Sequence, residues 1–336
     1  MIPLKTDKPI LSIGDACPDI ILPYGDTLQV MAALARGEAV NTEQKSAEIA
    51  AGGSVANTAH GIAVLGSKSW FAGKVGNDYF GRLLKNAFDS AGVDTRCLIL
   101  DDKIPTSLVI AVVGQDKNRV TYAIPRTQAS QHQITPADLP ENLLDQIGWL
   151  HTSGILLREN PAAETILDLM EQCIQRAIPV SLDLNIRIEA IGDQTSFERI
   201  QRAIKYSNIL FGSGKDELTL VTGEVTPQAA ATALLGPNRA VVCRSGSTGA
   251  DIYEPEGRFS HCSAFDVPVV DTLGAGDAYN AGFITAAAEG LSLAEANQRG
   301  NAVAAWKIMR VGARNFPNAQ QLEHFSRDYG RKFVGN

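Results

Sequence analysis

The sequence predicts a single α/β domain over residues 1–336, in three layers (α/β/α), with a mostly parallel central sheet and a small additional β-sheet. Three observations favour this fold. Strand-like and helix-like segments alternate along most of the chain. Apolar residues make up 45% of the 336 residues, which is enough for a large buried core. One stretch between residues 97 and 124 is rich in β-formers and has no helical pattern.

The alternation starts near the N-terminus, where residues 10–13 form an apolar run typical of a buried strand. Residues 54–65 follow with apolar side chains at helical spacing, and Gly92 ends the helix expected at 79–91. The other expected strands are 69–72, 148–152, 179–184, 208–211, 239–243 and 265–270, and the other expected helices are 161–177, 196–206, 226–235 and 278–288. Such alternation is typical of βαβ units, whose strands run parallel beneath helices.

The β-rich stretch breaks this alternation. Turn-forming residues at 101–102 and 114–118 separate its segments. The segments are 97–101, 107–113 and 119–124, and those near 19–24 and 46–51 could join them. We expect a small second sheet, inserted into the main domain, that covers a site. Extra strands on the main sheet are the alternative.

Composition and charge argue against several classes of partner. The net charge is −7 and no basic cluster stands out, so nucleic acid is not expected as a partner. The five cysteines are scattered and never in CxxC spacing, as expected of reduced, mostly buried thiols. No apolar run approaches the ~18 residues of a membrane span, and the N-terminus lacks the apolar core of a signal peptide. We therefore expect a cytoplasmic protein with no membrane partner.

The most informative motif is DTLGAGD at residues 271–277. It follows the apolar run at 265–270 and precedes a run rich in helix formers. A strand, a tight turn of small residues and a helix leave backbone N–H groups pointing beyond the helix start, which suits a phosphate. The carboxylate of Asp277 would repel that phosphate, so it is better suited to accept a proton from an attacking hydroxyl. The motif therefore indicates phosphoryl transfer.

A second motif, GGSVAN at residues 52–57, opens the helix expected at 54–65. Gly52 and Gly53 would let the backbone come close to a ligand, and Asn57 offers both a donor and an acceptor. The alternative is a simple loop with an internal asparagine.

Two other glycine-rich stretches lack positions that known nucleotide motifs need. Tyr279 stands where a dinucleotide fingerprint after Gly274 needs its third glycine. GSGK at 212–215 ends like a P-loop, but Ile209 replaces the first glycine and Asp216 the Mg²⁺-binding Ser or Thr. We discount both motifs.

The two retained motifs together closely resemble the two signatures of the ribokinase-like (PfkB) sugar kinases. The first signature covers Gly52, Gly53, Asn57 and Ala59 and runs through Leu65 and Gly66, and the second is the DTLGAGD stretch. The resemblance extends, in motif order and spacing, over roughly residues 10–316.

This resemblance implies a three-layer α/β domain with a small β lid. The lid would be formed by inserted segments at about 16–51 and 96–126. The resemblance also implies ATP and Mg²⁺ as cofactors, with K⁺ in some members of the family.

By the same resemblance, Asp277 is the catalytic base that deprotonates the acceptor hydroxyl. The N–H groups of Gly274, Ala275 and Gly276 form the anion hole for the γ-phosphate. These roles agree with the demands of phosphoryl transfer, which needs in-line positioning and fixed donors for the developing charge. The alternative for Asp277 is a structural helix cap.

On the substrate side, the resemblance assigns Asp19 to sugar hydroxyls, with Gly52, Gly53 and Asn57 completing the pocket. Asp15 would help to bind the sugar or would orient the loop after the first strand. Carboxylates and amides suit polyols because each can bridge two hydroxyls. Either aspartate could instead be a turn residue.

On the nucleotide side, the segment RSGSTG that begins at Arg244 resembles the glycine-bearing ATP loop of the family. Arg244, Gly246 and Gly249 are therefore expected to bind ATP, and Asn301 matches a position near the adenine. Arg187, in a D-x-N-x-R segment, could meet a phosphate or a substrate carboxylate. A structural ion pair is the alternative.

The expected metal site departs from the family pattern. Relatives carry N-x-x-E, whose Asn and Glu organise phosphate and hydrated Mg²⁺, whereas this chain has SGKDE from Ser213. Ser213 with Asp216 fits one register and Gly214 with Glu217 the other, and neither keeps the asparagine. Ser213 is expected to meet the nucleotide, and Asp216 and Glu217 to meet Mg²⁺. Asp271 is expected to order a monovalent-cation site of the K⁺ type.

These expectations define an ATP- and Mg²⁺-dependent kinase whose partners are ATP and a small sugar or sugar acid. Cys17 stands where ribokinases have asparagine, which weakens the case for ribose. The alternatives are a nucleoside kinase of the same family and a non-catalytic sugar-binding regulator that kept the fold. Retention of the whole anion-hole turn argues against the regulator. A homodimer through the lid is expected by analogy with relatives.

Overall fold

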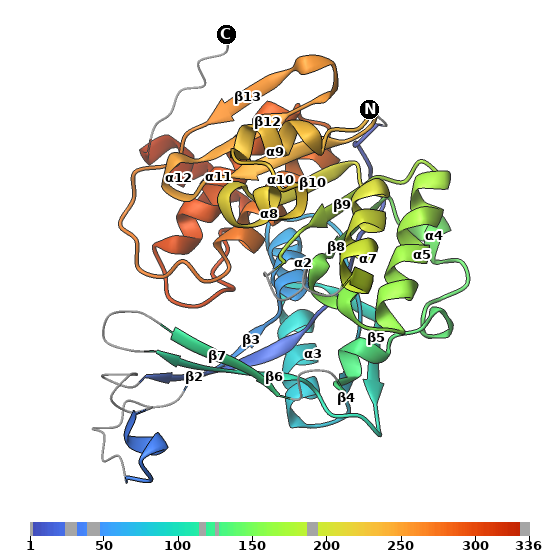
Figure 1. Cartoon of the computed structure of the whole chain (residues 1–336), viewed down its shortest axis with the longest axis vertical. Coiled ribbons are helices and arrows are strands. Elements are labelled where there is room, and N and C mark those ends of the chain that lie inside the picture. Colours follow the sequence, from blue (N-terminus) through green and yellow to red (C-terminus); the bar gives the residue numbers. More distant parts are fainter. Residues whose placement is uncertain are drawn as a thin grey trace.

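A nine-stranded sheet with helices on both faces organises the chain, and a four-stranded sheet lies apart from it (Figure 1). The computed structural model describes residues 3–23, 32–38, 48–113, 119–124, 128–186 and 194–329. This arrangement confirms the predicted three-layer α/β fold with a small additional sheet.

The large sheet is parallel except at one edge. In spatial order its strands are β13 (Phe259–Cys262), β12 (Ala250–Tyr253), β11 (Ala240–Arg244), β10 (Ile209–Ser213), β9 (Val180–Asp183), β8 (Trp149–Ser153), β1 (Ile10–Ile13), β4 (Ser69–Gly76) and β5 (Asp94–Asp101). Neighbours from β11 to β5 pair in parallel, whereas β12 and β13 are antiparallel. The carboxyl ends of the parallel strands therefore share one edge, where ligands bind in open α/β sheets.

Alternating strand residues supply a core on each face of this sheet. On β10, Leu210 packs into one core, whereas Ile209 and Phe211 pack into the other. Helices α4 (Leu143–Gln146), α5 (Ala162–Gln175), α7 (Gln194–Lys205) and α9 (Pro227–Ala233) cover the first face, and α2 (Ser54–Val64), α3 (Tyr79–Ala91), α10 (Ala275–Glu289), α11 (Leu293–Ile308) and α12 (Ala319–Asp328) cover the second. The predicted helices all occur, with small shifts at their ends.

The small sheet projects from the body of the molecule beside α3 (Figure 1). Its strands, in spatial order, are β3 (Glu48–Gly52), β2 (Cys17–Pro23), β6 (Leu108–Val113) and β7 (Arg119–Ile124). The central pair β2 and β6 is parallel, and the outer pairs are antiparallel. The prediction of a second sheet from these four segments is confirmed.

Residues 97–101 do not belong to the small sheet, which corrects the predicted lid segment at 96–126. They lie in β5, which pairs in parallel with β4 at the edge of the large sheet. Cys97 is fully buried in the core of that sheet. The local pattern of β-formers predicted a strand here but could not show which sheet the strand would join.

Residues 265–270, predicted as a strand before the DTLGAGD motif, form an irregular connection instead. Pro268 has no N–H group to donate to a strand ladder. The N–H groups of Val270 and Asp271 both donate to the carbonyl of Ile308 at the end of α11, at 2.8 and 3.1 Å. The segment is therefore held by a helix end rather than by a sheet.

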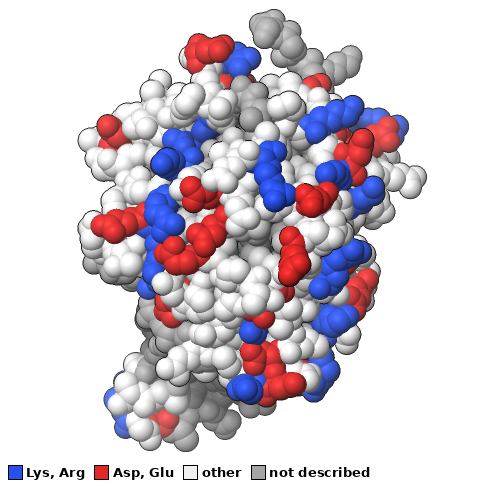
Figure 2. All heavy atoms as spheres, turned by 90° about the vertical axis from the view of Figure 1, so that its right-hand side faces the viewer, with Lys and Arg blue, Asp and Glu red and all other residues white. Residues whose placement is uncertain are grey.

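Charge is mixed on the surface, and the cysteines are mostly buried. Figure 2 shows Lys and Arg side chains interspersed with Asp and Glu on the face that it presents. None of the five cysteines, all of which are described, forms a disulfide, and four of them are buried. Over the described ranges, no helix combines the length and the apolar character that crossing a bilayer requires.

Candidate active site

Polar side chains gather where the parallel strands end. Asp15 follows β1, Asp183 closes β9, Ser213 closes β10 and Arg244 closes β11. The first turn of α10, which carries Asp277, comes to the same edge, since a Cβ atom on Gly276 of this turn would lie 2.9 Å from Arg244 Nη1. Residues far apart in the sequence thus meet at one end of the sheet.

The carboxylate of Asp277 lies between the N-terminal turns of α10 and α2. Its side chain is buried, with 8% of the residue exposed. Ser54 Oγ donates to Oδ1 at 2.7 Å, and Asn57 Nδ2 donates to Oδ2 at 2.8 Å. These two bonds fix the orientation of the carboxylate, and both donors are neutral. Among the described residues, Asp277 forms no ion pair.

The environment of Asp277 suits a proton acceptor. Burial raises its pKa to about 7, against the opposing effect of the hydrogen bonds from Asn57 and Ser54. The nearby charges of Asp183 and Asp15 raise the pKa further. A carboxyl whose pKa lies near neutrality can both hold and release a proton at physiological pH. Its side chain forms no bond to a backbone amide of its own helix, which argues against a simple helix cap.

The first turn of α10 is open at its N-terminus. Gly274 stands at the N-cap with a φ of 75° and, as a glycine, has no side chain that could cap the helix. Ala275 donates its N–H to the Thr272 carbonyl at 3.2 Å. The N–H groups of Gly274 and Gly276 make no hydrogen bond to any other residue within the described ranges. Of the three predicted anion-hole amides, these two remain available to an anion.

Arg244 places a positive charge against this turn. Its Nη2 and Nη1 donate to the two carboxylate oxygens of Asp183 at 2.7 and 3.1 Å, and Nη1 also donates to Asn280 Oδ1 at 3.0 Å. A Cβ atom added to Gly276 would lie 2.9 Å from Nη1. Burial alone would lower the pKa of Arg244, but the charges of Asp183 and Glu217 outweigh it and raise the pKa. The guanidinium therefore stays charged next to Gly276 of the predicted anion hole.

Asp15 caps helix α2. The amides of Ser54 and Val55 donate to its two carboxylate oxygens at 2.7 and 3.3 Å. The residue is 4% exposed, and burial raises its pKa. Gly53, with a φ of 96°, lies so close that a Cβ there would come within 2.7 Å of the Asp15 carbonyl oxygen. This geometry favours the loop-orienting role over direct contact with a sugar.

Asp19 and Gly52 meet on neighbouring strands of the small sheet. Cys17 of β2 is paired with Gly52 of β3, and Asp19 is paired with Ala50. A Cβ at Gly52 would collide with the Asp19 carboxylate, so the glycine leaves room for that side chain. The small sheet therefore carries Asp19 next to the start of α2, where Asn57 lies.

Arg314 is a site residue that no sequence motif indicated. It follows α11, is partly buried, and donates from Nε to Asn57 Oδ1 and from Nη2 to the Gly52 carbonyl, both at 2.9 Å. Burial lowers its pKa to about 10, although the charges of Asp19 and Asp277 oppose that shift. Its buried Nη1 has no partner among the described residues. Because Arg314 donates to the side-chain oxygen Oδ1 of Asn57, the side-chain nitrogen Nδ2 of Asn57 faces Asp277.

The sequence motifs also did not indicate two further contacts of the site. Ser54 bonds to Asp277, and its place at a helix start is a signal that could have drawn attention to it. Asn280 donates to Asp183 at 2.6 Å from the second turn of α10, and no motif pointed to it. Both residues hold the charged groups of the site in place.

Two of the predicted nucleotide residues, Gly249 and Asn301, lie at the end of β13. Gly246 and Gly249 have φ values of 57° and 101°, which only a glycine adopts readily. A Cβ on Gly249 would collide with the Cys262 carbonyl, and Asn301 Nδ2 donates to that same carbonyl at 3.5 Å. The structure thus brings Gly249 and Asn301 together. Arg187 lies outside the described residues.

The predicted metal residues lie on the turn after β10. Glu217 accepts from the Ser213 N–H at 2.6 Å and lies 3.7 Å from Arg244 Nη2. Burial and the charge of Asp183 raise its pKa to about 7, against the opposing effect of Arg244. Asp216 is exposed and accepts from Ser213 Oγ at 3.3 Å. Over the described ranges, no three His, Cys, Asp or Glu side chains converge to hold a metal by themselves.

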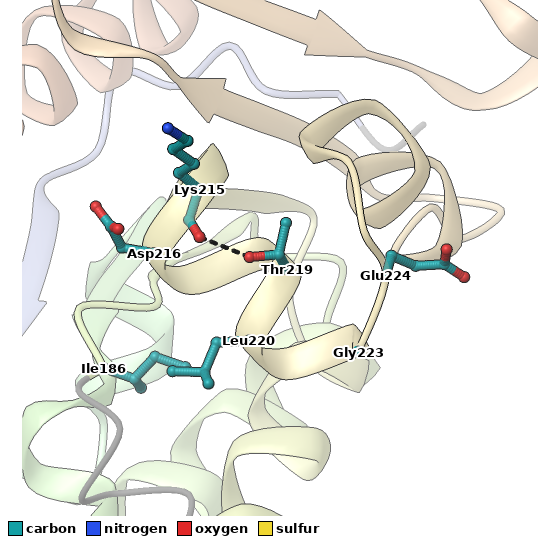
Figure 3. A pocket seen from close by; sticks show the side chains of 7 residues that line it. All are labelled: Ile186, Lys215, Asp216, Thr219, Leu220, Gly223 and Glu224. Atoms are coloured by element: carbon teal, nitrogen blue, oxygen red, sulfur yellow. Dashed lines mark hydrogen bonds between the residues drawn. The ribbon is translucent and has the colours of Figure 1, made fainter.

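A hollow of about 530 Å³ adjoins this turn (Figure 3). Asp216 and Lys215 lie on one side of it and Glu224 on another, and Thr219 donates to the Lys215 carbonyl at 2.6 Å. The full lining is Ile186, Lys215, Asp216, Thr219, Leu220, Gly223 and Glu224. The hollow shows that Asp216 is accessible from solvent, whereas Glu217 faces inward.

Asp271 ties two loops together at the start of α10. Its Oδ1 accepts from the Leu273 N–H and its Oδ2 from the Gly312 N–H, both at 2.9 Å. Gly312 belongs to the loop that follows α11. A Cβ on Gly274 would lie 2.9 Å from the Cβ of Ala313, so this loop also packs against the anion-hole turn.

Comparison with known proteins gives a consistent result over nearly the whole chain. Residues 10–320 match the profile of the pfkB family carbohydrate kinases. The 2-dehydro-3-deoxygluconokinase of Bacillus subtilis (strain 168) is 30% identical over 284 residues, which cover 81% of this chain and 85% of that protein.

Two solved structures have the same fold along their length. Aminoimidazole riboside kinase from Salmonella enterica, complexed with aminoimidazole riboside and an ATP analog, matches with a TM-score of 0.77 at 27% identity, covering 94% of this chain and 99% of that one. A fructokinase double mutant from Vibrio cholerae O395, bound to fructose, ADP and potassium ion, matches with a TM-score of 0.77 at 25% identity, covering 96% and 99%.

Proposed function

The chain belongs to the pfkB family of carbohydrate kinases, and from this premise we propose that it transfers the γ-phosphate of ATP to a hydroxyl of a small sugar or sugar acid. The observation that carries the proposal is the buried carboxylate of Asp277, with a pKa of about 7, in the first turn of an uncapped helix. A proton acceptor and a phosphate site lie there within one helical turn. Phosphoryl transfer to a hydroxyl needs both.

In this proposal Asp277 takes the proton from the acceptor hydroxyl. Ser54 and Asn57 hold the carboxylate in one orientation, and Arg314 holds Asn57. The amides of Gly274 and Gly276 bind the transferring phosphoryl oxygens. Donors that are fixed before the reaction stabilise the developing charge without having to reorganise.

The acceptor would bind between the small sheet and helix α2. Asp19 and Asn57 supply carboxylate and amide groups suited to hydroxyls. Arg314 Nη1, a buried donor with no partner among the described residues, would meet an acceptor oxygen of the substrate. Closure of the small sheet over this pocket would exclude water, which otherwise competes as an acceptor of the phosphoryl group.

The residues after β10 fit a hydrated Mg²⁺ ion. Mg²⁺ in such enzymes is commonly held by one or two carboxylates together with substrate phosphates and waters. Asp216 is exposed and would hold the ion, and Glu217, whose carboxylate lies 3.7 Å from Arg244 Nη2, would hold the waters of the ion. The metal would offset the negative charge of the phosphates. ATP would lie across Ser213, Arg244, Gly246, Gly249 and Asn301.

The experiment that tests the proposal is a panel of sugars, sugar acids and ribosides with ATP and Mg²⁺, followed by ADP release and mass spectrometry of the products. We expect one class of acceptor to be phosphorylated well above the rate without acceptor. ATP binding with no phosphorylated product in any class would contradict the proposal. Efficient phosphorylation of ribosides alone would favour a nucleoside kinase, a candidate supported by the riboside-bound structural relative.

Two further expectations stay predictions. A homodimer formed through the small sheet would be tested by light scattering on the purified protein, with and without substitution of Ile49 on β3 and Ile124 on β7, which are exposed. A cytoplasmic location would be tested by cell fractionation.

A further inference from the structure

A buried lysine lies at the position where the sequence led us to expect a monovalent cation. Lys307, on α11, is 0% exposed. Its Nζ donates to the backbone carbonyl of Asp271 at 2.7 Å and lies 3.7 Å from Asp271 Oδ2. A charged group buried without a partner is costly in free energy, so such a lysine needs close oxygen acceptors. The Asp271 carbonyl and carboxylate provide them.

The residues present do not fit a K⁺ ion at Asp271. Alkali cations bind to sets of carboxylate and carbonyl oxygens, as other hard cations do. The Asp271 carbonyl is already in contact with the ammonium group of Lys307. Two positive charges a few ångströms apart in a buried site repel each other strongly. The Lys307 ammonium and a K⁺ ion at the same oxygens would therefore exclude each other.

Lys307 is linked to the anion-hole turn through one residue. Asp271, which Lys307 contacts, holds the amides of Leu273 and Gly312. The loop containing Gly312 packs directly on Gly274 through Ala313. The charge of Lys307 thus balances the carboxylate that orders both sides of this turn.

We propose that Lys307 is a built-in cation, a positioning residue that orders the anion-hole turn and makes the enzyme independent of added K⁺. This inference rests on the proposed kinase function for its activity readout. The effect of Lys307 on the order of the turn does not depend on which acceptor the enzyme phosphorylates. Lys307 acts on the anion-hole turn through Asp271 rather than by contact with the reacting atoms.

The test begins with the wild-type enzyme at constant ionic strength in tetramethylammonium, sodium, potassium or ammonium chloride. We expect kcat and the thermal unfolding midpoint to be the same in all four salts. Lys307→Ala should lose about 10-fold or more in kcat in tetramethylammonium, since a displaced anion-hole turn is misaligned. K⁺ or NH₄⁺ should restore much of that loss and raise the unfolding midpoint of this variant.

Two variants serve as controls. Lys307→Met fills the volume without the charge, so it should show the loss with no rescue by K⁺. Lys85→Ala removes an exposed lysine that pairs with Asp89, and it should behave as wild type. Saturable activation of the wild-type enzyme by K⁺, or full activity of Lys307→Met in tetramethylammonium, would overturn the inference. If no acceptor is phosphorylated, the proposed function fails, while the salt dependence of the unfolding midpoints still decides this inference.

Discussion

The N-terminal turns of α2 and α10 begin alike, yet one is closed and the other is open. Each starts at a glycine with positive φ, 96° for Gly53 and 75° for Gly274. At α2 the carboxylate of Asp15 accepts from the first two amides of the helix. At α10 the amides of Gly274 and Gly276 meet no acceptor within the described ranges. A capped helix end supports structure, whereas an uncapped end can bind an anion.

The two aspartates at these turns differ in the same way. Asp15 accepts from backbone amides with both carboxylate oxygens, as a helix cap does. Among the described residues, the carboxylate of Asp277 accepts from the side chains of Ser54 and Asn57 and from no others, and burial raises its pKa to about 7. The same residue type thus serves as a cap in one turn and as a candidate base in the other.

The largest effect is expected from closing the open turn. Gly276→Asp would place a carboxylate at the start of α10, next to Arg244 Nη1. The fold should survive, because a negative charge is favourable at a helix N-terminus. The carboxylate should repel the phosphate and reduce kcat by about 10²–10³-fold, the effect of losing an oxyanion donor. Steady-state kinetics with saturating ATP measures this loss.

The matched control is Gly276→Asn, which has almost the same shape and no charge. We expect it to retain clearly more activity than the aspartate variant. Equal rates for the two variants would show that bulk rather than charge matters, and would remove the argument for an anion at this turn.

The pH dependence of the reaction tests the raised pKa of Asp277. Asp277 must be deprotonated to accept a proton, so activity should be lost as pH falls below its pKa of about 7. We expect kcat/KM to fall about 10-fold per pH unit on that side and to level off above it. Because Glu217 has a pKa raised to a similar value, Glu217→Gln is the control and should keep the same acid limb. A limb near the ordinary pKa of a carboxyl would contradict the assignment.

A smaller effect is expected from releasing Asn57. Arg314→Met keeps the bulk but removes the hydrogen bonds to Asn57 and Gly52. We expect kcat/KM for the acceptor to fall about 10-fold, in line with the loss of hydrogen bonds to a charged group. Arg310→Met removes a neighbouring arginine that stacks on Trp306, and it should leave kcat/KM unchanged. A loss of the same size in both variants would indicate a general structural effect.

The smallest effect on turnover is expected at the closed turn. Asp15→Ala removes the cap of α2 and should lower the free energy of unfolding by about 1–2 kcal/mol. Urea denaturation measures this change. Asp19→Ala, on the small sheet, should leave the free energy of unfolding nearly unaltered while weakening acceptor binding. If Asp19→Ala proved the more destabilising of the two, Asp15 could not be the cap that we describe.

The sequence predicts the parts of this site that are local. The turn from Asp271 to Asp277 is contiguous, so its helix start and its carboxylate are recognisable without a structure. Arg314 is different, because it reaches Asn57 from a loop 257 residues away in the chain. No spacing rule links two such positions, so only the fold shows that they meet.

The errors in the predicted fold have the same origin. The sequence predicts a strand at residues 97–101, but the choice between the two sheets depends on the pairing of this strand with β4. Residues 265–270 are apolar, but Pro268 and the carbonyl of Ile308 keep them out of a sheet. Local pattern predicts that a segment is extended or apolar, and long-range contacts decide its partner.

The most direct test of the central claim is kcat of Asp277→Asn beside the wild-type enzyme, with circular dichroism and thermal unfolding to check the fold. The asparagine keeps the size of the side chain and can still accept a hydrogen bond, but it cannot take a proton. We expect an intact fold and a loss of about 10²-fold or more in kcat, as for removal of a general base. Near-normal turnover in this folded variant would contradict the role of Asp277.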